Sequence, residues 1–287
     1  MCRHLAYLGP PVTLASLLYD PPHSLVHQSW APRQQRHGTI NADGFGVGWY
    51  APDLQAEPAR YRRAGAMWAD RSLASLARVV TSGAVVAAVR SATPPTPTEE
   101  SGAAPFASER WLFSLNGVIS GDLVTWRRLV SNRRQAGIEG ASDAEVLFAL
   151  LLDRLDRGLA PADALADLLA TVPGRLNVLL VDGTSLWATV WGDTLWWRSV
   201  GAGGADRTST TPAVGASGAD RSSETRVGGA GVIVASEPLD DDPLWTAVPP
   251  QSLLEATSVG GAPSVRVRSL GAPFPTSYKE EGGVPVA

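Results

Sequence analysis

The chain begins Met1-Cys2-Arg3-His4-Leu5-Ala6-Tyr7-Leu8, and the apolar run after the cysteine predicts a strand over residues 3–8. Aminopeptidases remove an initiator methionine when the next side chain is small, which would leave Cys2 with a free α-amine of pKa about 7.7–8.0. A thiol and a near-neutral amine on one residue supply a nucleophile together with its base. A strand directly after Cys2 would hold this pair at the end of a sheet. The alternative is a cysteine that occupies a frayed terminus by chance.

Further apolar runs beyond this stretch predict more strands. Asp182-Gly183-Thr184-Ser185 predicts a hairpin between residues 176–181 and 186–191, and Gly192-Asp193 predicts a turn into a third strand at 194–200. Such a three-strand meander favours antiparallel sheet. The other predicted strands cover residues 45–50, 85–90, 111–115, 232–236 and 265–270.

Helical patterns are fewer. Ser142-Asp143-Ala144-Glu145 predicts the capped start of a helix over residues 146–155, and Pro161 predicts the first turn of a helix over 162–169. Residues 12–19 and 70–80 are further helix candidates. Because the strands come in clusters and the helices in pairs, we expect an α+β fold of packed, mainly antiparallel sheets with helices outside.

Composition narrows the function classes. The 287 residues include 28 acidic and 24 basic side chains and no basic block, which argues against a nucleic-acid partner. No run reaches the roughly 18 apolar residues of a membrane span, and Gly9-Pro10-Pro11 interrupts the one stretch that resembles a signal peptide. A single cysteine cannot form an internal disulfide. We therefore expect a cytoplasmic protein with a small-molecule substrate, and the sequence leaves any protein partner open.

Two patterns are not expected to bind a cofactor. Gly44-x-Gly46-x-Gly48 resembles a dinucleotide fingerprint, but no βαβ unit surrounds it, so we interpret its glycines as allowing close packing in a strand. The four histidines lack the spacing of a zinc site. Neither a metal nor another cofactor is predicted. Residues 201–229, rich in Gly, Ala, Ser and Thr, are predicted to be a flexible insert, and 271–287 a loosely ordered tail.

Three segments place polar side chains where chemistry needs them. Asn116-Gly117 follows a predicted strand, and an amide with a backbone N–H at one spot is what an oxyanion hole requires, although a plain turn is the alternative. Arg90 follows five small apolar residues, so its guanidinium could bind a carboxylate at the rim of a buried strand or form a surface ion pair. Asp143 could hold an ammonium group or only cap a helix.

Together these segments resemble the class II glutamine amidotransferases, whose glutaminase domain has the N-terminal-nucleophile hydrolase fold. Within that family the chain is similar to the stand-alone amidohydrolases of ergothioneine biosynthesis. The resemblance covers about residues 2–270 and implies a four-layer αββα fold with the flexible insert outside it. It rests on four motifs in order: Met1-Cys2-Arg3-His4-Leu5, Asn41-Ala42-Asp43-Gly44-Phe45-Gly46-Val47-Gly48-Trp49, Ala87-Ala88-Val89-Arg90-Ser91-Ala92-Thr93 and Ala235-Ser236-Glu237-Pro238-Leu239.

The resemblance implies a role for each candidate residue: Cys2 as nucleophile, Asn116 and Gly117 as oxyanion hole, Arg90 and Thr93 for the α-carboxylate of a glutamyl group, and Asp143 for its α-amine. The sequence departs from the family at Leu115 and Pro94, where many members have histidine. In Arg36-His37-Gly38 the first two residues of a family loop are transposed.

The implied reaction is hydrolysis of the γ-glutamyl amide of γ-glutamyl-hercynylcysteine sulfoxide through a Cys2 thioester. The alternatives are a glutaminase subunit that supplies ammonia to a separate synthetase and a catalytically inactive binding relative. Because the leaving group carries a fixed positive charge that aromatic faces attract, Trp30, Trp49 or Trp68 is a candidate to contact it, with ordinary core packing as the alternative.

Overall fold

The strand that follows Cys2 has a hydrophobic core on both of its faces. The computed structural model describes residues 2–36, 38–92, 97–201, 222–226, 230–258 and 263–271. In it, β1 (Arg3–Thr13) places Leu5 and Tyr7 in one buried cluster and Ala6 and Leu8 in another. Successive side chains of a strand point to opposite faces of its sheet, so β1 lies in a sheet that is covered on both sides. The predicted strand is confirmed and continues further than expected.

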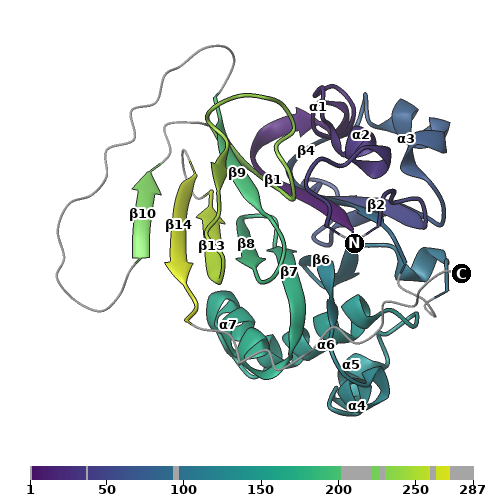
Figure 1. The fold of residues 1–287 in the computed structure, drawn as a ribbon, viewed down its shortest axis with the longest axis vertical. Helices are drawn as coiled ribbons and strands as arrows, with labels where there is room; N and C mark the ends of the chain where they lie inside the picture. The colour runs from purple at the N-terminus through teal and green to yellow at the C-terminus, as the bar shows by residue number, and fades with distance from the viewer. Residues whose placement is uncertain are drawn as a thin grey trace, which may run out of the picture.

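Two antiparallel sheets make up the centre of the molecule (Figure 1). The first sheet contains, in spatial order, β12 (Thr246–Ala247), β9 (Trp196–Val200), β11 (Gly231–Ala235), β1, β4 (Thr81–Arg90), β2 (Gly44–Trp49) and β3 (Ala59–Arg63). The second contains β10 (Ser222–Arg226), β14 (Ser264–Ser269), β13 (Ser252–Thr257), β8 (Ser185–Val190), β7 (Gly174–Val181), β6 (Trp111–Ile119) and β5 (Phe106–Ser108).

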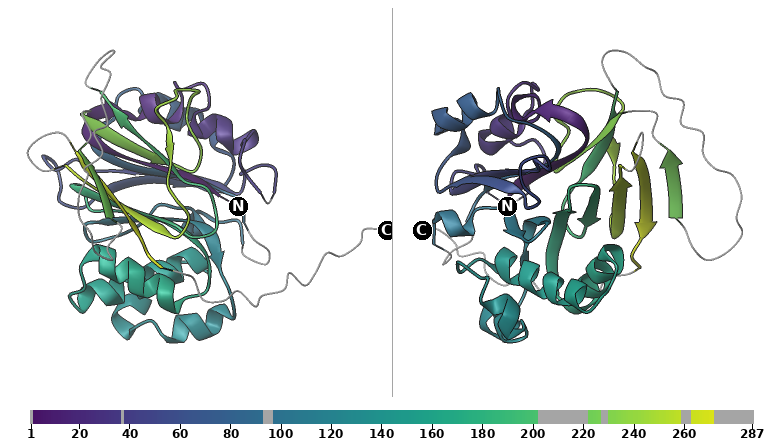
Figure 2. Two further views of the ribbon diagram at one scale, coloured as in Figure 1. Left: turned by 60° about the vertical axis from the view of Figure 1, so that its left-hand side comes forward. Right: turned by 180° about the vertical axis from the view of Figure 1, so that it is seen from behind.

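Helices cover the outer face of each sheet, and Figure 2 shows the resulting layers edge-on in its left view. One buried cluster joins the first sheet to its helices, a second joins the other sheet to its helices, and a third fills the space between the sheets. The predicted four-layer α+β arrangement is therefore confirmed. On the first sheet lie α1 (Leu14–Leu18), α2 (Leu25–Trp30) and α3 (Arg71–Leu76); on the second lie α6 (Asp143–Asp156) and α7 (Pro161–Thr171), beside α4 (Leu123–Arg128) and α5 (Asn132–Gln135).

The local signals for the two long helices are confirmed. The side chain of Ser142 accepts a hydrogen bond from the backbone N–H of Ala144, and α6 begins at Asp143. Proline stands at the first position of α7, where its missing N–H is harmless. Two short 3₁₀ helices, η1 (Met67–Ala69) and η2 (Glu100–Gly102), complete the helical elements of the described residues.

The predicted three-strand meander is wrong in its last strand. Strands β7 and β8 do form the expected hairpin, but β9 pairs with β11 and β12 in the other sheet. The amide of Asn177 on β7 bonds the backbone carbonyls of Asp193 and Thr194, and Leu195 is buried between the sheets. These contacts redirect the chain across the sandwich, and they involve residues too far apart for a local turn signal to reveal.

Glycines in β2 allow close packing against the strand, as expected. A Cβ on Gly46 would lie 2.5 Å from the carbonyl oxygen of Ala104, so no side chain fits there. The expected insert and tail fall outside the described residues, except for Gly201, Gly271 and β10, which pairs with β14. Within the ranges described, no helix is long and apolar enough to cross a membrane.

Candidate active site

A cavity of about 530 Å³, measured out to its open mouth, lies where the two sheets meet the start of α6. Four of the predicted site residues line it: Cys2, Arg90, Gly117 and Asp143. Cys2 directly precedes β1, and the pairing of Arg3 with Val89 places it beside Arg90 at the end of β4. Gly117 lies on β6 of the opposite sheet. The cavity thus collects a thiol, a guanidinium and a carboxylate from segments far apart in the sequence.

Asn116 is fully buried next to Gly117, yet neither its Nδ2 nor its Oδ1 has a hydrogen-bond partner among the described residues. Buried amides are nearly always bonded, because an unpaired polar group costs about 1–3 kcal/mol. Asn116 itself does not line the cavity, but it directly precedes Gly117, which does, and an unpaired donor next to a nucleophile can stabilise a negatively charged oxygen.

The strand around Asn116 corrects one prediction. The predicted strand end at Leu115 is wrong, because β6 continues to Ile119 and pairs Asn116 with Asn177 on β7. Gly117 has φ +155°, and a Cβ there would lie 1.8 Å from the carbonyl oxygen of Arg175. Only glycine fits this position of the paired strand, so the Asn-Gly pair is part of a sheet and not a turn.

Arg90 is buried and carries a charge that no carboxylate of the described residues neutralises in an ion pair. Its Nη1 donates to the carbonyl of Pro97 at 3.2 Å, and the described residues offer the rest of the guanidinium no further side-chain hydrogen bond. A surface ion pair, the alternative considered for this residue, is therefore not what the structure contains. The free donors are available to a ligand carboxylate, which guanidinium binds in a bidentate manner.

Asp143 is anchored by backbone groups from two elements. Its Oδ2 accepts a hydrogen bond from the N–H of Ile119 at 3.0 Å, and its Oδ1 accepts one from Ala144 at 2.9 Å. Burial nevertheless raises the pKa of the Asp143 carboxyl, against the lowering effect of these hydrogen bonds and of Arg90. A cation bound in the cavity would supply the compensation that the ionised carboxylate lacks.

The Cys2 thiol is held in its neutral form. Burial raises the pKa of Cys2 above its ordinary value, and the charges of the chain terminus and of Arg90 do not reverse the shift. The thiol therefore stays protonated near neutral pH and needs a base before it can attack. Of the remaining predicted residues, Thr93 lies outside the described residues, as do Pro94 and His37.

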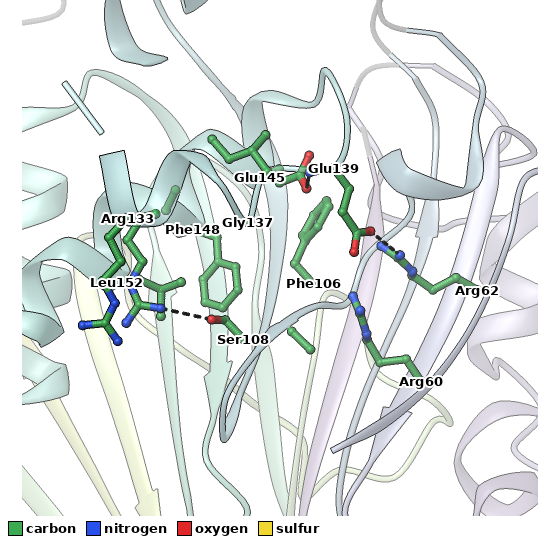
Figure 3. Close-up of a pocket in the computed structure, with 14 residues that line it drawn as sticks. Arg60, Arg62, Phe106, Ser108, Arg133, Gly137, Glu139, Glu145, Phe148 and Leu152 are labelled. Atoms are coloured by element: carbon green, nitrogen blue, oxygen red, sulfur yellow. Dashed lines mark hydrogen bonds and ion pairs between the residues drawn. The ribbon is translucent and has the colours of Figure 1, made fainter. Parts of the chain in front are cut away.

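A second and larger hollow, of about 750 Å³, shares Phe106 with the Cys2 cavity. Figure 3 shows Phe106 and Phe148 in its middle, with Arg60 and Arg62 on one side and Arg133 on the other. Arg62 is paired with Glu139 at 2.9 Å. The residues lining this hollow include the Ser108 hydroxyl but no thiol, whereas the smaller cavity has the Cys2 thiol and lies next to an unpaired amide. The chemistry therefore favours the smaller one.

Comparisons with known proteins agree with this geometry. A family model described as "Glutamine amidotransferases class-II" matches residues 14–269. The chain belongs to the class-II glutamine amidotransferases.

Individual relatives give the same assignment. A protein of Mycolicibacterium smegmatis named gamma-glutamyl-hercynylcysteine sulfoxide hydrolase is 37% identical over 255 residues, which is 89% of this chain and 95% of the relative. Among solved structures, a glutamine aminotransferase class-II domain protein from Silicibacter pomeroyi superimposes with a TM-score of 0.62 at 24% identity, over 94% of this chain and all of the other. The glutamine PRPP amidotransferase of B. subtilis has a TM-score of 0.59 at 15% identity, over 94% of this chain and 49% of its own. The two structures support the N-terminal-nucleophile fold.

One departure from the amidotransferase pattern can be placed. Leu115, where many members have histidine, lines the cavity and gives it an apolar wall. The tryptophan hypothesis gains no support, because none of Trp30, Trp49 and Trp68 lines the cavity. Trp30 and Trp68 pack edge to face at 5.7 Å, and each is 42% exposed.

Three buried polar residues around Cys2 in this amidotransferase were not predicted from the sequence. Arg3 and Glu237 form an ion pair in which both side chains are fully buried. His4 lies 3.1 Å from the Ser114 hydroxyl and so connects β1 to β6. Burial and the charge of Arg3 lower the pKa of His4 to about 3, so the ring is neutral. The available signal was the unusual presence of two polar residues, Arg3 and His4, at the start of an otherwise apolar strand.

Proposed function

We propose that the chain hydrolyses the γ-glutamyl amide of γ-glutamyl-hercynylcysteine sulfoxide and releases glutamate and hercynylcysteine sulfoxide, as expected for ergothioneine biosynthesis. The observation that carries the proposal is the single cavity in which Cys2, Arg90 and Asp143 meet beside the unpaired amide of Asn116. The identity of the amine product is supported by the name of the mycobacterial relative, at 37% identity over most of both chains.

Binding of the glutamyl group would use the two uncompensated charges. The guanidinium of Arg90 takes the α-carboxylate, and Asp143 takes the α-ammonium, which removes the electrostatic cost of its buried carboxylate. We assign Thr93 to the same carboxylate on the family pattern alone. Holding both charges fixes the γ-carbonyl against the Cys2 thiol, which converts a bimolecular encounter into a local one.

Acylation begins once Met1 has been removed and the α-amine of Cys2 is free. The amine accepts the thiol proton, Sγ bonds to the carbonyl carbon of the γ-amide, and the carbonyl oxygen becomes an oxyanion. The Nδ2 of Asn116 and the backbone N–H of Gly117 donate to that oxygen. The amine then returns the proton to the leaving nitrogen as the carbon–nitrogen bond breaks, and a γ-glutamyl thioester remains.

Deacylation repeats the steps with water. The α-amine takes a proton from the attacking water, the same donors hold the second oxyanion, and the carbon–sulfur bond breaks to give glutamate and the free thiol. No cofactor or metal takes part in this scheme. We further propose that residues 2–270 act as one domain on a small molecule in the cytoplasm, which agrees with the single cysteine and the lack of a basic block.

The test compares substrates and nucleophile variants on purified protein. We expect kcat/KM for the γ-glutamyl sulfoxide to exceed that for glutamine, and we expect Cys2→Ala to abolish turnover. Intact mass should show a mature chain that begins at Cys2, and rapid acid quenching should trap a chain heavier by one glutamyl group.

The pH profile tests the base. Because burial raises the thiol pKa, kcat/KM should rise with pH through the range of the α-amine, about 7.7–8.0. Turnover by Cys2→Ala, or an active chain that retains Met1, contradicts the mechanism. Equal or better use of glutamine would instead indicate a glutaminase subunit.

A further inference from the structure

Arg3, the residue after the proposed nucleophile, has one of the largest fully buried side chains in the described residues. It lies on the face of β1 opposite to that of its neighbours Cys2 and His4, because side chains alternate along a strand. Its Nε donates a hydrogen bond to the backbone carbonyl of Cys2 at 2.8 Å. The guanidinium thus contacts the nucleophilic residue through the backbone while pointing away from the cavity.

Glu237 holds this guanidinium from the far end of the chain. Its Oε1 lies 3.1 Å from Nη1 of Arg3, while its Oε2 accepts a hydrogen bond from the backbone N–H of Arg33 at 2.7 Å and lies 2.9 Å from Nε2 of His23. Burial opposes ionisation of this carboxyl, but the bonds from His23, Gln34 and Arg33 and the charge of Arg3 together hold the pKa of Glu237 below its ordinary value. The carboxylate is therefore ionised and fixed by several partners.

A buried ion pair of this kind contributes little to the free energy of unfolding by itself. Moving two charges out of water costs several kcal/mol per ion, and replacement of buried pairs by apolar side chains is often neutral or stabilising. The pair also lies next to Cys2, whose orientation matters for attack on the substrate. Once Met1 is removed, Cys2 has no preceding residue, and the first pairing of β1 with β4 involves Arg3. The bond from Arg3 Nε to its carbonyl therefore restrains the backbone of Cys2, in addition to the hydrogen bond that the backbone N–H of Ser91 gives to the thiol.

We propose that Arg3, anchored by Glu237, is a positioning residue for the Cys2 nucleophile. Its bond to the Cys2 carbonyl restrains the backbone torsion ψ of Cys2 and so keeps the thiol and the α-amine aimed into the cavity. The inference rests on the proposed role of Cys2, but it concerns residues that touch neither substrate nor reacting atoms.

The test replaces the guanidinium while keeping its charge. Arg3→Lys retains a cation opposite Glu237 but cannot also bond the Cys2 carbonyl in the same geometry. We expect kcat to fall on the order of 100-fold, the effect of a displacement near 1 Å, with KM changed by less than about threefold. The alkylation rate of Cys2 by iodoacetamide, which needs no substrate, should change in the same variant.

Glu237→Gln provides a second variant, which keeps the shape of the anchor and removes its charge; we expect a smaller fall in kcat. The matched control is Arg154→Lys, because Arg154 is also buried, and it bonds Asp167 and the carbonyl of Leu150 away from the cavity. This control should lower the melting temperature and leave kcat unchanged.

The outcomes separate the two proposals. If Arg3→Lys and Glu237→Gln both keep wild-type kcat and alkylation rates while Cys2→Ala is inactive, the positioning role is wrong and the nucleophile stands. If Arg154→Lys lowers kcat as much as Arg3→Lys does, the effect of Arg3 is that of any buried arginine and the pair is structural. Turnover by Cys2→Ala would overturn the proposed function itself.

Discussion

Two asparagines lie opposite each other on β6 and β7, one with hydrogen-bond partners and one without. From this difference we predict how their replacement affects kcat and stability. Asn116 and Asn177 are paired in register and both are fully buried. Asn116 has no hydrogen-bond partner for its side chain within the described residues. Asn177 bonds the carbonyls of Asp193 and Thr194 through Nδ2, and its Oδ1 accepts hydrogen bonds from the N–H groups of Trp191 and Asp193.

Replacing each by alanine should therefore separate activity from stability. Asn116→Ala removes an oxyanion donor and should lower kcat about 100- to 1,000-fold, or roughly 3–4 kcal/mol. It also removes two unpaired buried polar atoms, so the free energy of unfolding should stay within about 1 kcal/mol of wild type or rise. Asn177→Ala leaves four backbone groups without partners and should cost at least about 3 kcal/mol, while kcat changes little.

Steady-state kinetics on the γ-glutamyl substrate and thermal melting of both variants test this pair. A loss of 3 kcal/mol should lower the melting temperature of Asn177→Ala by roughly 6–12 °C, against little change for Asn116→Ala. The reasoning is refuted if Asn116→Ala keeps wild-type kcat, or if it loses as much stability as Asn177→Ala. Either result would mean that the Asn116 amide already has a hydrogen-bond partner in the protein without ligand.

Two further predictions concern charged groups of the site. Asp143→Asn should raise KM about 10- to 100-fold by removing a charge-assisted bond to the α-ammonium, whereas turnover of glutaramate, which lacks that ammonium, should be unaffected; equal losses on glutamine and glutaramate would contradict the assignment. His4 has a folded-state pKa of about 3 against 6.5 unfolded, so its contribution to stability is complete above pH 6.5 and is lost as pH falls. Between pH 7 and 5 it should account for about 2 kcal/mol of the loss in urea unfolding, and a His4→Gln variant with the same pH dependence as wild type would show that His4 is not responsible.

The sequence predicted those parts of the fold that depend on neighbouring residues. The strands around Leu5, Phe45 and Val85 follow from apolar runs, α6 follows from its capping residue Ser142, and α7 follows from the proline at its first position. The edge strand β3 was missed because Ala59-Arg60-Tyr61-Arg62-Arg63 has no apolar alternation. The sheet to which β9 belongs could not be predicted, since it is determined by the contacts of Asn177 and Leu195 with distant segments.

The candidate site shows the same division. The side chains of Cys2, Arg90 and Asp143 suggested a nucleophile, a carboxylate-binding group and an ammonium-binding group. The structure brings all three to one cavity. Sequence could not reveal the contact of Arg3 with Glu237, because the two residues are 234 positions apart. It also placed Asn116 at a strand end, whereas the residue lies inside a paired strand whose geometry depends on Gly117.

The distribution of satisfied and unsatisfied groups indicates how the site is organised. Behind Cys2, the buried charges of Arg3 and Glu237 are paired, and the His4 ring beside them is neutral. At the cavity the opposite holds: the amide of Asn116, which directly precedes the lining residue Gly117, is unpaired, and burial raises the pKa of the lining residue Asp143. An unpaired buried group destabilises the folded chain until a ligand supplies its partner, whereas a paired one fixes the geometry in the absence of ligand. The paired network therefore determines the orientation of the Cys2 thiol, and the unpaired groups determine which ligand binds next to it.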